Sequence, residues 1–190
     1  YWQILQDQLT RLKNLTDDLL AVSRFESHSL AGDWEQLSIG KILQVALGDI
    51  VHQAEAKNIT VEKDIDTNLP QVLGNEKDLY QAITNLLVNA IKFTLEGGRV
   101  IIDAGVRDGN ICLRVGDNGI GIPPDDVKNL FSRFYRASNA IQNEIPGTGI
   151  GLFLVKSIVE GMGGSISVES ELGVGTTFTL MIPPVKVENT

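Results

Sequence analysis

Polar side chains at helical spacing mark the middle of the chain. At about 100° per residue they share one stripe of a helix, and the five residues are Asp78, Gln81, Asn85, Asn89 and Lys92. A solvated face would explain such a stripe, but Asn is a poor helix former, and Glu, Lys or Gln would serve a wet surface better. The Asn side chain offers an amide and a neutral carbonyl oxygen, which suit a hard cation or a polar ligand. With the charge of Lys92, the stripe predicts one wall of a site for Mg²⁺ and phosphate.

A carboxylate and two glycines follow an apolar stretch, at Asp117, Gly119 and Gly121. Such a string is typical of a turn, because Asn and Gly accept positive φ. In a functional interpretation, Asp117 ends a strand and points its carboxylate into a pocket. A group that only accepts hydrogen bonds would recognise an exocyclic amine such as that of adenine. The glycines would then let a planar base lie against bare backbone.

Three glycines, Gly147, Gly149 and Gly151, precede an apolar helix. They serve either to pack that helix on a sheet or to expose N–H donors at the positive end of the helix dipole, where phosphates bind. They do not form a dinucleotide fingerprint, since no strand immediately precedes them and the sixth position counted from Gly149 is Leu154. A P-loop is excluded as well, because no Gly-Lys pair is followed by Ser or Thr.

Two phenylalanines and two arginines lie between these glycine groups: Phe131, Arg133, Phe134 and Arg136. One interpretation is a surface helix with aromatic anchors. The other is a mobile lid whose arginines reach phosphate oxygens once a nucleotide is bound. Both interpretations remain open at the level of these residues.

Composition narrows the choice of partners and compartment. The chain has 190 residues, 43% of them hydrophobic, and a net charge of −8, so we expect no general affinity for nucleic acid or anionic membranes. The single cysteine, Cys112, permits neither an internal disulfide nor a cysteine-based metal site, and a reducing interior fits it best. No apolar run is long enough to span a bilayer, and there is no signal peptide. We expect a cytoplasmic part of a longer protein whose remainder can carry a membrane anchor.

The elements that must position these residues begin with one long helix. About 28 residues lack Gly and Pro, and residues recur alternately three and four apart at Trp2, Leu5, Leu9, Leu12, Thr16 and Leu19, all but Thr16 apolar. This pattern is the seam of a coiled coil or helical bundle, which needs a partner to bury it. A break at residues 30–33 predicts the domain boundary, with residues 1–30 as the helix and 31–187 as the globular domain.

The globular part alternates short strands with capped helices. Strands are expected at 34–37, 59–65, 72–73, 99–106, 111–115, 165–169 and 176–182, the last two pairs as hairpins. Helices are expected from a cap at Ser38 to about Lys57, from a cap at Asn75 through the polar stripe, and from the third glycine group to about Met162. On the stripe-bearing helix, Phe93 is expected on the buried face. This order predicts an α/β two-layer sandwich, a mixed sheet with helices on one face, preceded by one long helix.

The ordered set of motifs resembles the catalytic and ATP-binding domain of sensor histidine kinases of two-component systems. The asparagine stripe, the group at Asp117, the phenylalanine pair and the third glycine group match the N, G1, F and G2 boxes of that family. The resemblance covers about residues 33–184, and the first helix is similar to the end of the second helix of the dimerisation and phosphoacceptor domain. It implies the Bergerat-type ATP-binding fold, which gyrase-like and chaperone ATPases share.

The resemblance also implies a role for each matching residue. Asn89 would hold Mg²⁺ with support from Asn85, Lys92 would neutralise phosphate charge, Arg136 would close over the phosphates, and Asp117 would bind the adenine amine. The remaining cofactor-binding residues would border the base, contact the phosphates or join a water network around the adenine; they are Gly119, Gly121, Ile122, Gly147, Thr148, Gly149, Gly151, Leu152 and Thr176.

By the same resemblance, the reaction is transfer of the γ-phosphoryl group of ATP to a histidine and then to an aspartate of a response-regulator receiver domain. The acceptor helix would come from the same or the partner subunit of a homodimer. In the family, an acidic residue follows the acceptor histidine and a proline lies a few positions on. His28 and His52, the only histidines, lack that context and are expected to have surface roles. The chain should therefore bind ATP without autophosphorylating.

Two other functions remain open. A hydrolase on the same fold would carry a Glu in place of Asn85 to activate water, so hydrolysis by this chain should be slow. A non-enzymatic docking module gated by nucleotide would bind a partner through the first helix and leave a histidine unmodified.

Overall fold

The computed structural model describes Thr16 and residues 34–185. The long helix predicted for the first 28 residues, its boundary near residue 30 and His28 lie outside the described residues, apart from Thr16. The division into residues 1–30 and 31–187 therefore stays a prediction.

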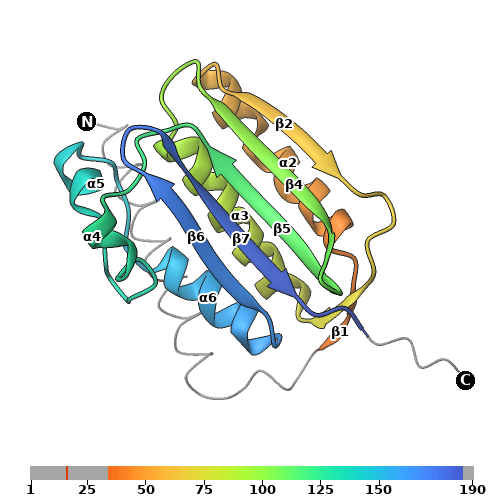
Figure 1. Cartoon of the computed structure of the whole chain (residues 1–190). Helices are drawn as coiled ribbons and strands as arrows, with labels where there is room; N and C mark the ends of the chain where they lie inside the picture. Colours follow the sequence, from red (N-terminus) through yellow and green to blue (C-terminus); the bar gives the residue numbers. More distant parts are fainter. Residues whose placement is uncertain (1–15, 17–33, 186–190) are drawn as a thin grey trace, which may run out of the picture.

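A five-stranded mixed sheet forms one layer of the molecule (Figure 1). Its strand order is β2-β4-β5-β7-β6, in which β2 runs parallel to β4 and all other neighbours are antiparallel. The strands are β2 (Thr60–Ile65), β4 (Arg99–Arg107), β5 (Asn110–Asp117), β6 (Ser165–Glu171) and β7 (Gly175–Ile182). The two predicted hairpins are β4-β5 and β6-β7. A small second sheet pairs β1 (Glu35–Leu37) with β3 (Val72–Gly74).

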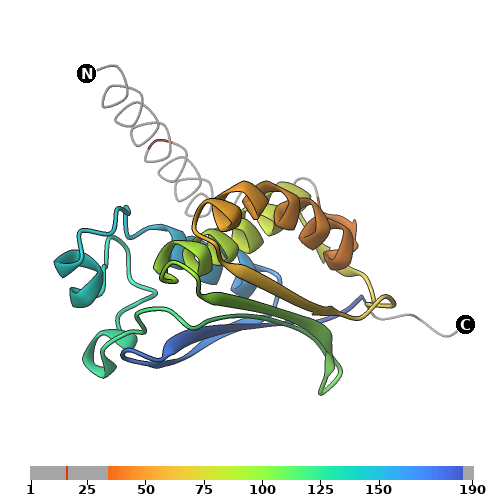
Figure 2. The ribbon, with the colours of Figure 1, turned by 90° about the horizontal axis from the view of Figure 1, so that it is seen from above.

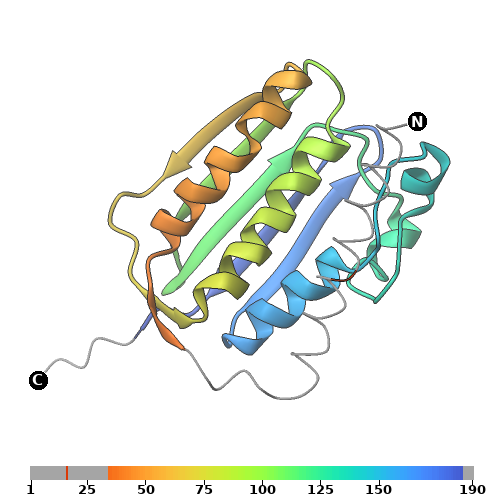
Figure 3. The same ribbon diagram turned by 180° about the vertical axis from the view of Figure 1, so that it is seen from behind.

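Three helices form the second layer on one face of this sheet, as Figure 2 shows from the side and Figure 3 from behind. They are α2 (Ile39–Ala56), α3 (Glu76–Phe93) and α6 (Gly151–Gly161). Two short helices, α4 (Pro124–Val127) and α5 (Ser138–Gln142), lie beyond one end of the sheet. The predicted α/β two-layer sandwich, with a mixed sheet and helices on one face, is confirmed.

Alternation in the strands and helical periodicity in α3 build the core between the layers. In β7, every second residue from Thr176 to Ile182 is buried, and the intervening residues are partly exposed. The buried stripe of α3 includes Leu79, Ile83 and Leu86, all fully enclosed. Each such side chain stabilises the fold by about 1.5–3 kcal/mol relative to an exposed one. The polar stripe of α3 is thereby turned away from the sheet.

Both long helices begin at the predicted caps. The side chain of Ser38 accepts a hydrogen bond from the Lys41 N–H, and the side chain of Asn75 accepts one from the Asp78 N–H at 3.2 Å. Within residues 34–185, no helix combines the length and apolar character needed to cross a bilayer.

Hydrogen bonds join the C-terminal end of α3 to the residue after α2 and to the turn after β5. The Lys57 ammonium, just after α2, donates to the carbonyl oxygens of Ile91, Lys92 and Thr94 at 3.0, 2.9 and 2.9 Å. These are carbonyls that a helix end leaves without intrahelical partners. The N–H of Ile120, in the turn after β5, donates to the Phe93 carbonyl at 3.2 Å. The fold thus places the polar stripe of α3 beside the end of the strand that carries Asp117.

Candidate functional site

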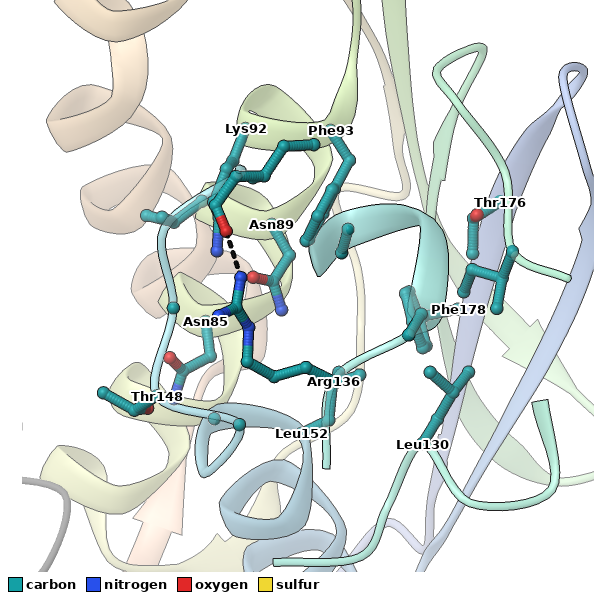
Figure 4. A pocket seen from close by; sticks show the side chains of 18 of the residues that line it. Asn85, Asn89, Lys92, Phe93, Leu130, Arg136, Thr148, Leu152, Thr176 and Phe178 are labelled. Carbon is teal, nitrogen blue, oxygen red and sulfur yellow. Dashed lines mark hydrogen bonds between the residues drawn. The ribbon is translucent and has the colours of Figure 1, made fainter. Parts of the chain in front are cut away.

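A cavity of about 1130 Å³ is enclosed by α3, the turn after β5, the segment leading into α6, and β7 (Figure 4). Of the residues to which the family resemblance assigns a role, all except Gly119 line this cavity. Those residues are Asn85, Asn89, Lys92, Asp117, Gly121, Ile122, Arg136, Gly147, Thr148, Gly149, Gly151, Leu152 and Thr176. Segments far apart in the sequence therefore meet at one place.

The wall formed by α3 presents Asn85, Asn89 and Lys92 from successive turns of one helix (Figure 4). Gln81 also lines the cavity, whereas Asp78, predicted on the same stripe, does not. The buried Nδ2 of Asn85 has no hydrogen-bond partner among the described residues. An amide donor buried without a partner is costly, and a ligand acceptor in the cavity would relieve that cost.

The prediction that Phe93 lies on the buried face of α3 is wrong. Its ring is partly exposed, lines the cavity and lies 4.7 Å from the Lys92 Nζ, measured to the ring centroid. The stripe of α3 that faces the sheet ends one turn earlier, at Ala90 and Ile91. The last turn of the helix therefore contributes an aromatic side chain to the site.

Two cationic groups converge beside the backbone of Gly147. A Cβ atom built on Gly147 would lie 3.0 Å from the Lys92 Nζ and 4.0 Å from the Arg136 Nε. Burial, together with the nearby charge of Arg136, lowers the pKa of Lys92 to about 8. Within residues 34–185, neither cation has a carboxylate partner. Two like charges held together without an acidic partner suit an anionic ligand.

Asp117 supplies the carboxylate of the site. Burial raises the pKa of Asp117 to about 6, although backbone hydrogen bonds from Gly119 and Thr176 oppose the rise. The Gly119 N–H donates to the Asp117 Oδ1 at 2.9 Å. In the ladder between β5 and β7, Asp117 is paired with Thr176, so register places both in the same wall. Thr176 is 7% exposed, and its hydroxyl lies 2.8 Å from the Ser170 hydroxyl.

The glycines after β5 pack closely against neighbouring backbone. A Cβ on Gly119 would lie 2.2 Å from the Phe93 carbonyl oxygen, and one on Gly121, where φ is +62°, would lie 2.0 Å from the Glu171 carbonyl oxygen. Close backbone packing therefore requires glycine at both positions, and the predicted contact with a base stays a prediction. Gly119 lies outside the cavity lining and acts through its hydrogen bond to Asp117. Gly121 and Ile122 do line the cavity.

The glycines before α6 pack closely against neighbouring elements and also line the cavity. Gly149 has φ +76°, and a Cβ on it would lie 2.6 Å from the Phe134 backbone, while one on Gly151 would lie 3.1 Å from the Asn85 side-chain oxygen. Close packing is therefore required here. The same residues line the cavity, and no side chain caps the N-terminus of α6, so its first N–H groups are left for a ligand or water.

Residues 124–150, here named the lid segment, face α3 across the cavity. Arg136 reaches into the cavity, and its guanidinium donates to the Ile145 carbonyl oxygen (Figure 4). Arg133, which the lid interpretation would bring to phosphate in the presence of nucleotide, lies over the Phe153 ring, 4.5 Å from the centroid, and does not line the cavity. Phe131 packs edge-on against Phe178, with ring centroids 6.5 Å apart, as an aromatic anchor would.

Sequence reasoning missed several residues of the lid segment that line the cavity, including Tyr135 and Asn139. Asn139 is 8% exposed and its Nδ2 donates to the Gly121 carbonyl at 2.8 Å, while its Oδ1 has no hydrogen-bond partner among the described residues. Neither helical nor strand periodicity marks this region, and its one distinguishing feature in the sequence is a run of small and polar residues.

The residues outside the site behave as expected. His52 is exposed and its Nδ1 lies 3.5 Å from the Glu55 carboxylate. Cys112 is buried as a free thiol. Among the described residues, no group of three or more His, Cys, Asp or Glu side chains is arranged to hold a metal ion.

Comparisons with known proteins agree with this geometry. Residues 74–186 match the family described as "Histidine kinase-, DNA gyrase B-, and HSP90-like ATPase". Sensor histidine kinase RppB of Synechocystis sp. is 35% identical over 179 residues, which are 94% of this chain and 39% of RppB. The chain thus spans well under half of that relative's length.

Two solved structures share the fold. Full-length ShkA, crystallised with AMPPNP, is 28% identical with a TM-score of 0.80, and the match covers 95% of this chain and 37% of that one. The mycobacterial sensor histidine kinase MprB is 29% identical with a TM-score of 0.69, covering 80% of this chain and 97% of that one. These matches confirm the predicted resemblance to histidine kinase ATPase domains. The chain therefore belongs to the family of histidine kinase-, DNA gyrase B- and HSP90-like ATPases.

Proposed function

We propose that this chain is the ATP-binding kinase domain of a sensor histidine kinase. It binds Mg·ATP and transfers the γ-phosphoryl group to a histidine other than His28 and His52, for relay to a response-regulator aspartate. The observation that carries this proposal is the shared cavity: the amide pair Asn85 and Asn89 and the carboxylate of Asp117 line one enclosed space.

The end of the cavity formed by β5 and β7 suits adenine. With its pKa raised to about 6, Asp117 is mainly ionised at pH 7 and accepts a hydrogen bond from an exocyclic amine. Ile122, Leu130 and Phe178 add apolar surface for a planar base. A guanine would present a carbonyl oxygen where adenine presents its amine, so Asp117 favours adenine over guanine.

The end formed by α3 and the lid segment suits a triphosphate. Lys92 and Arg136 converge beside Gly147, the Asn85 Nδ2 lacks a partner, and the first N–H groups of α6 are not capped by a side chain. All these groups are donors or cations, which is the complement that phosphate oxygens require.

The donor set also fits Mg²⁺ bound together with a nucleotide. Mg²⁺ commonly takes one or two protein oxygens and completes its octahedron with phosphates and waters. Asn89 provides such an oxygen, and the described residues offer no carboxylate cluster that would hold the ion alone. When bound, the ion neutralises charge on the phosphates.

The lining favours transfer over hydrolysis. Asp117 is the one carboxylate among the described residues that line the cavity, and it lies at the end of β5, in the part assigned to adenine. Asn85 stands where a hydrolase would need a base, and an amide cannot take a proton from water at neutral pH. Phosphoryl transfer depends chiefly on positioning and charge stabilisation, which this cavity provides.

The partners follow from this proposal. An acceptor helix from the same or a partner subunit of a homodimer brings the histidine to the open end of the cavity, and a receiver domain then takes the phosphoryl group. The domain works in the cytoplasm.

The test uses the full chain with a separately made acceptor helix and γ-labelled ATP. Label should appear on the histidine of that helix with the unsubstituted chain, called the parent chain below. It should also appear with the control Asn68→Ala, at an exposed asparagine outside the cavity. Asn89→Ala should leave the helix unlabelled. Rapid steady-state ATP hydrolysis with no label on the helix would contradict the proposal and favour a hydrolase, whereas nucleotide binding with neither reaction would favour a docking module.

A further inference from the structure

Asp126 in α4 binds two residues of the lid segment that flank Arg136. One carboxylate oxygen, Oδ1, accepts from the Tyr135 hydroxyl at 2.6 Å. The other, Oδ2, accepts from the Ser138 N–H at 2.8 Å and from the Ser138 hydroxyl at 2.7 Å. The hydrogen bonds from Tyr135 and Ser138 lower the pKa of Asp126, so it remains an ionised acceptor at neutral pH.

A second contact ties Asn139, the residue after Ser138, to the turn that follows β5. The Nδ2 of the buried Asn139 donates to the Gly121 carbonyl at 2.8 Å. The Asn143 Nδ2 in turn donates to the Asn139 carbonyl, also at 2.8 Å. Arg136 therefore lies on a short stretch of backbone that is held on both sides. Asp126 binds Tyr135 before it and Ser138 after it, and the Gly121 carbonyl binds Asn139.

The apolar packing of this region is small in extent. Its buried cluster contains Leu130, Ala137 and Ala140, and partly buried side chains, Tyr135 among them, pack against it. Phe134, next to Tyr135, is 62% exposed and has φ +61°, an unfavourable backbone conformation for a bulky residue. The hydrogen bonds of Asp126 therefore act together with a small apolar cluster in holding this turn of the chain.

We propose that Asp126 is a positioning residue for triphosphate binding: by holding Tyr135 and Ser138, it fixes the backbone from which Arg136 reaches the phosphates. This inference rests on the proposed function, because it assigns the anion beside Arg136 to a nucleotide. An arginine on fixed backbone binds phosphate more tightly than one whose backbone must be ordered on binding. The entropy cost of ordering has in that case been met when the protein folds.

A purely structural role makes a different prediction. If Asp126 only stabilised the start of α5, its removal would lower the melting temperature and would weaken adenosine and ATP equally or not at all. A positioning role acts through Arg136, so it weakens only ligands that carry phosphates. It also vanishes once Arg136 is gone.

The experiment measures the affinities of the full chain for Mg·ATP and for adenosine by calorimetry, together with the melting temperature. The variants are Asp126→Ala, Arg136→Ala, both together, and Asp125→Ala as the exposed neighbouring control. We expect Asp126→Ala to weaken Mg·ATP binding roughly tenfold, as for the loss of one charge-assisted contact, and to leave adenosine within about twofold. The double variant should bind Mg·ATP as weakly as Arg136→Ala and no more weakly.

Three results would overturn the proposal: Mg·ATP binding by Asp126→Ala equal to that of the Asp125→Ala control, equal weakening of adenosine, or additive losses in the double variant. Should Asp126→Ala fold poorly, Tyr135→Phe removes one of the same bonds and must give a smaller loss of the same kind. If Arg136→Ala binds Mg·ATP normally, the phosphate site of the proposed function is wrong as well. If Arg136→Ala weakens Mg·ATP binding as expected but Asp126→Ala does not, only the positioning role of Asp126 is rejected.

Discussion

The two walls of the cavity are held in place by different forces. The wall formed by α3 rests on a fully enclosed apolar stripe and on capped helix ends, whereas the lid segment rests on hydrogen bonds of Asp126 and Asn139 around a small cluster. Burial of large side chains fixes the first wall, and a few polar contacts fix the second. A site built this way keeps the side chains of α3 rigid on one side, including those proposed to bind metal and phosphate, and leaves the other side easier to rearrange around a ligand.

The largest effect should follow from removing the side chain on the rigid wall that we propose holds Mg²⁺. Asn89→Ala should weaken ATP binding by about 100-fold or more in the presence of Mg²⁺, because the ion would lose its protein oxygen. Chelating Mg²⁺ should then have little further effect on the variant but a large one on the parent chain. Calorimetry measures both, and a variant that still responds fully to chelation would place the ion elsewhere.

The next largest effect concerns the free energy of unfolding, which should respond differently to substitutions in the two walls. Leu86→Ala removes an enclosed side chain of α3 and should lower stability by about 2–5 kcal/mol, because it leaves a cavity in the core. Ile141→Ala, at a side chain of the lid segment that is 55% exposed, should change stability by less than about 0.5 kcal/mol. Denaturant unfolding of both variants gives the comparison. Similar losses at the two sites would mean that the lid segment is part of the main core.

A smaller loss is expected at the end of α3. Lys57→Met keeps the apolar stem but removes three hydrogen bonds to the carbonyls of α3, and we expect a loss of about 1–3 kcal/mol in the free energy of unfolding. Lys63→Met, on the exposed part of β2, is the matched control. Equal stability of the two variants would show that the helix end does not depend on Lys57.

The pH dependence of adenosine binding should report Asp117. The pKa of Asp117 is raised to about 6, so adenosine affinity should be constant above pH 7 and fall about tenfold for each pH unit below 6. The reason is that the carboxylate that accepts a hydrogen bond from the amine becomes protonated. Asp117→Asn should bind weakly with a flat profile, and Asp64→Asn, at an exposed position, should behave like the parent. Adenosine avoids the titration of phosphates, so a flat profile in the parent chain would remove Asp117 from the amine contact.

The same raised pKa has the opposite sign for stability without ligand. The folded state holds the Asp117 proton more tightly than the unfolded state does, so this group stabilises the fold fully below its ordinary pKa near 3.8 and loses that contribution as the pH rises through about 6. Compared with Asp117→Asn, the parent chain should therefore lose stability between pH 4 and 6.

Most of the fold was predictable because its elements carry local signals. Ser38 and Asn75 cap helices, the apolar stripe of α3 has helical period, and the two closing strands alternate, so type and order followed from the sequence. The rigid wall of the site shares this advantage, since Asn85 and Asn89 are placed by the same helical period. Phe93 was misplaced because the last turn of α3 projects past the sheet into the cavity.

The lid segment was predictable only in part, because its order depends on contacts between residues far apart in the chain. Nothing in the local sequence indicates that the Asn139 amide meets the Gly121 carbonyl or that Arg133 turns to Phe153 while Arg136 enters the cavity. The close packing at Gly119 and Gly121 was not predictable either, since the carbonyls that crowd these glycines belong to other elements.

The most direct test of a single nucleotide site is a calorimetric titration of Mg·ATP into the parent chain, Asn89→Ala and Asp117→Asn. If the two walls serve one ligand, the parent chain binds one Mg·ATP and each substitution alone removes or greatly weakens that binding, with Asp117→Asn also losing the preference for ATP over GTP. Unchanged affinity in both variants would contradict the account.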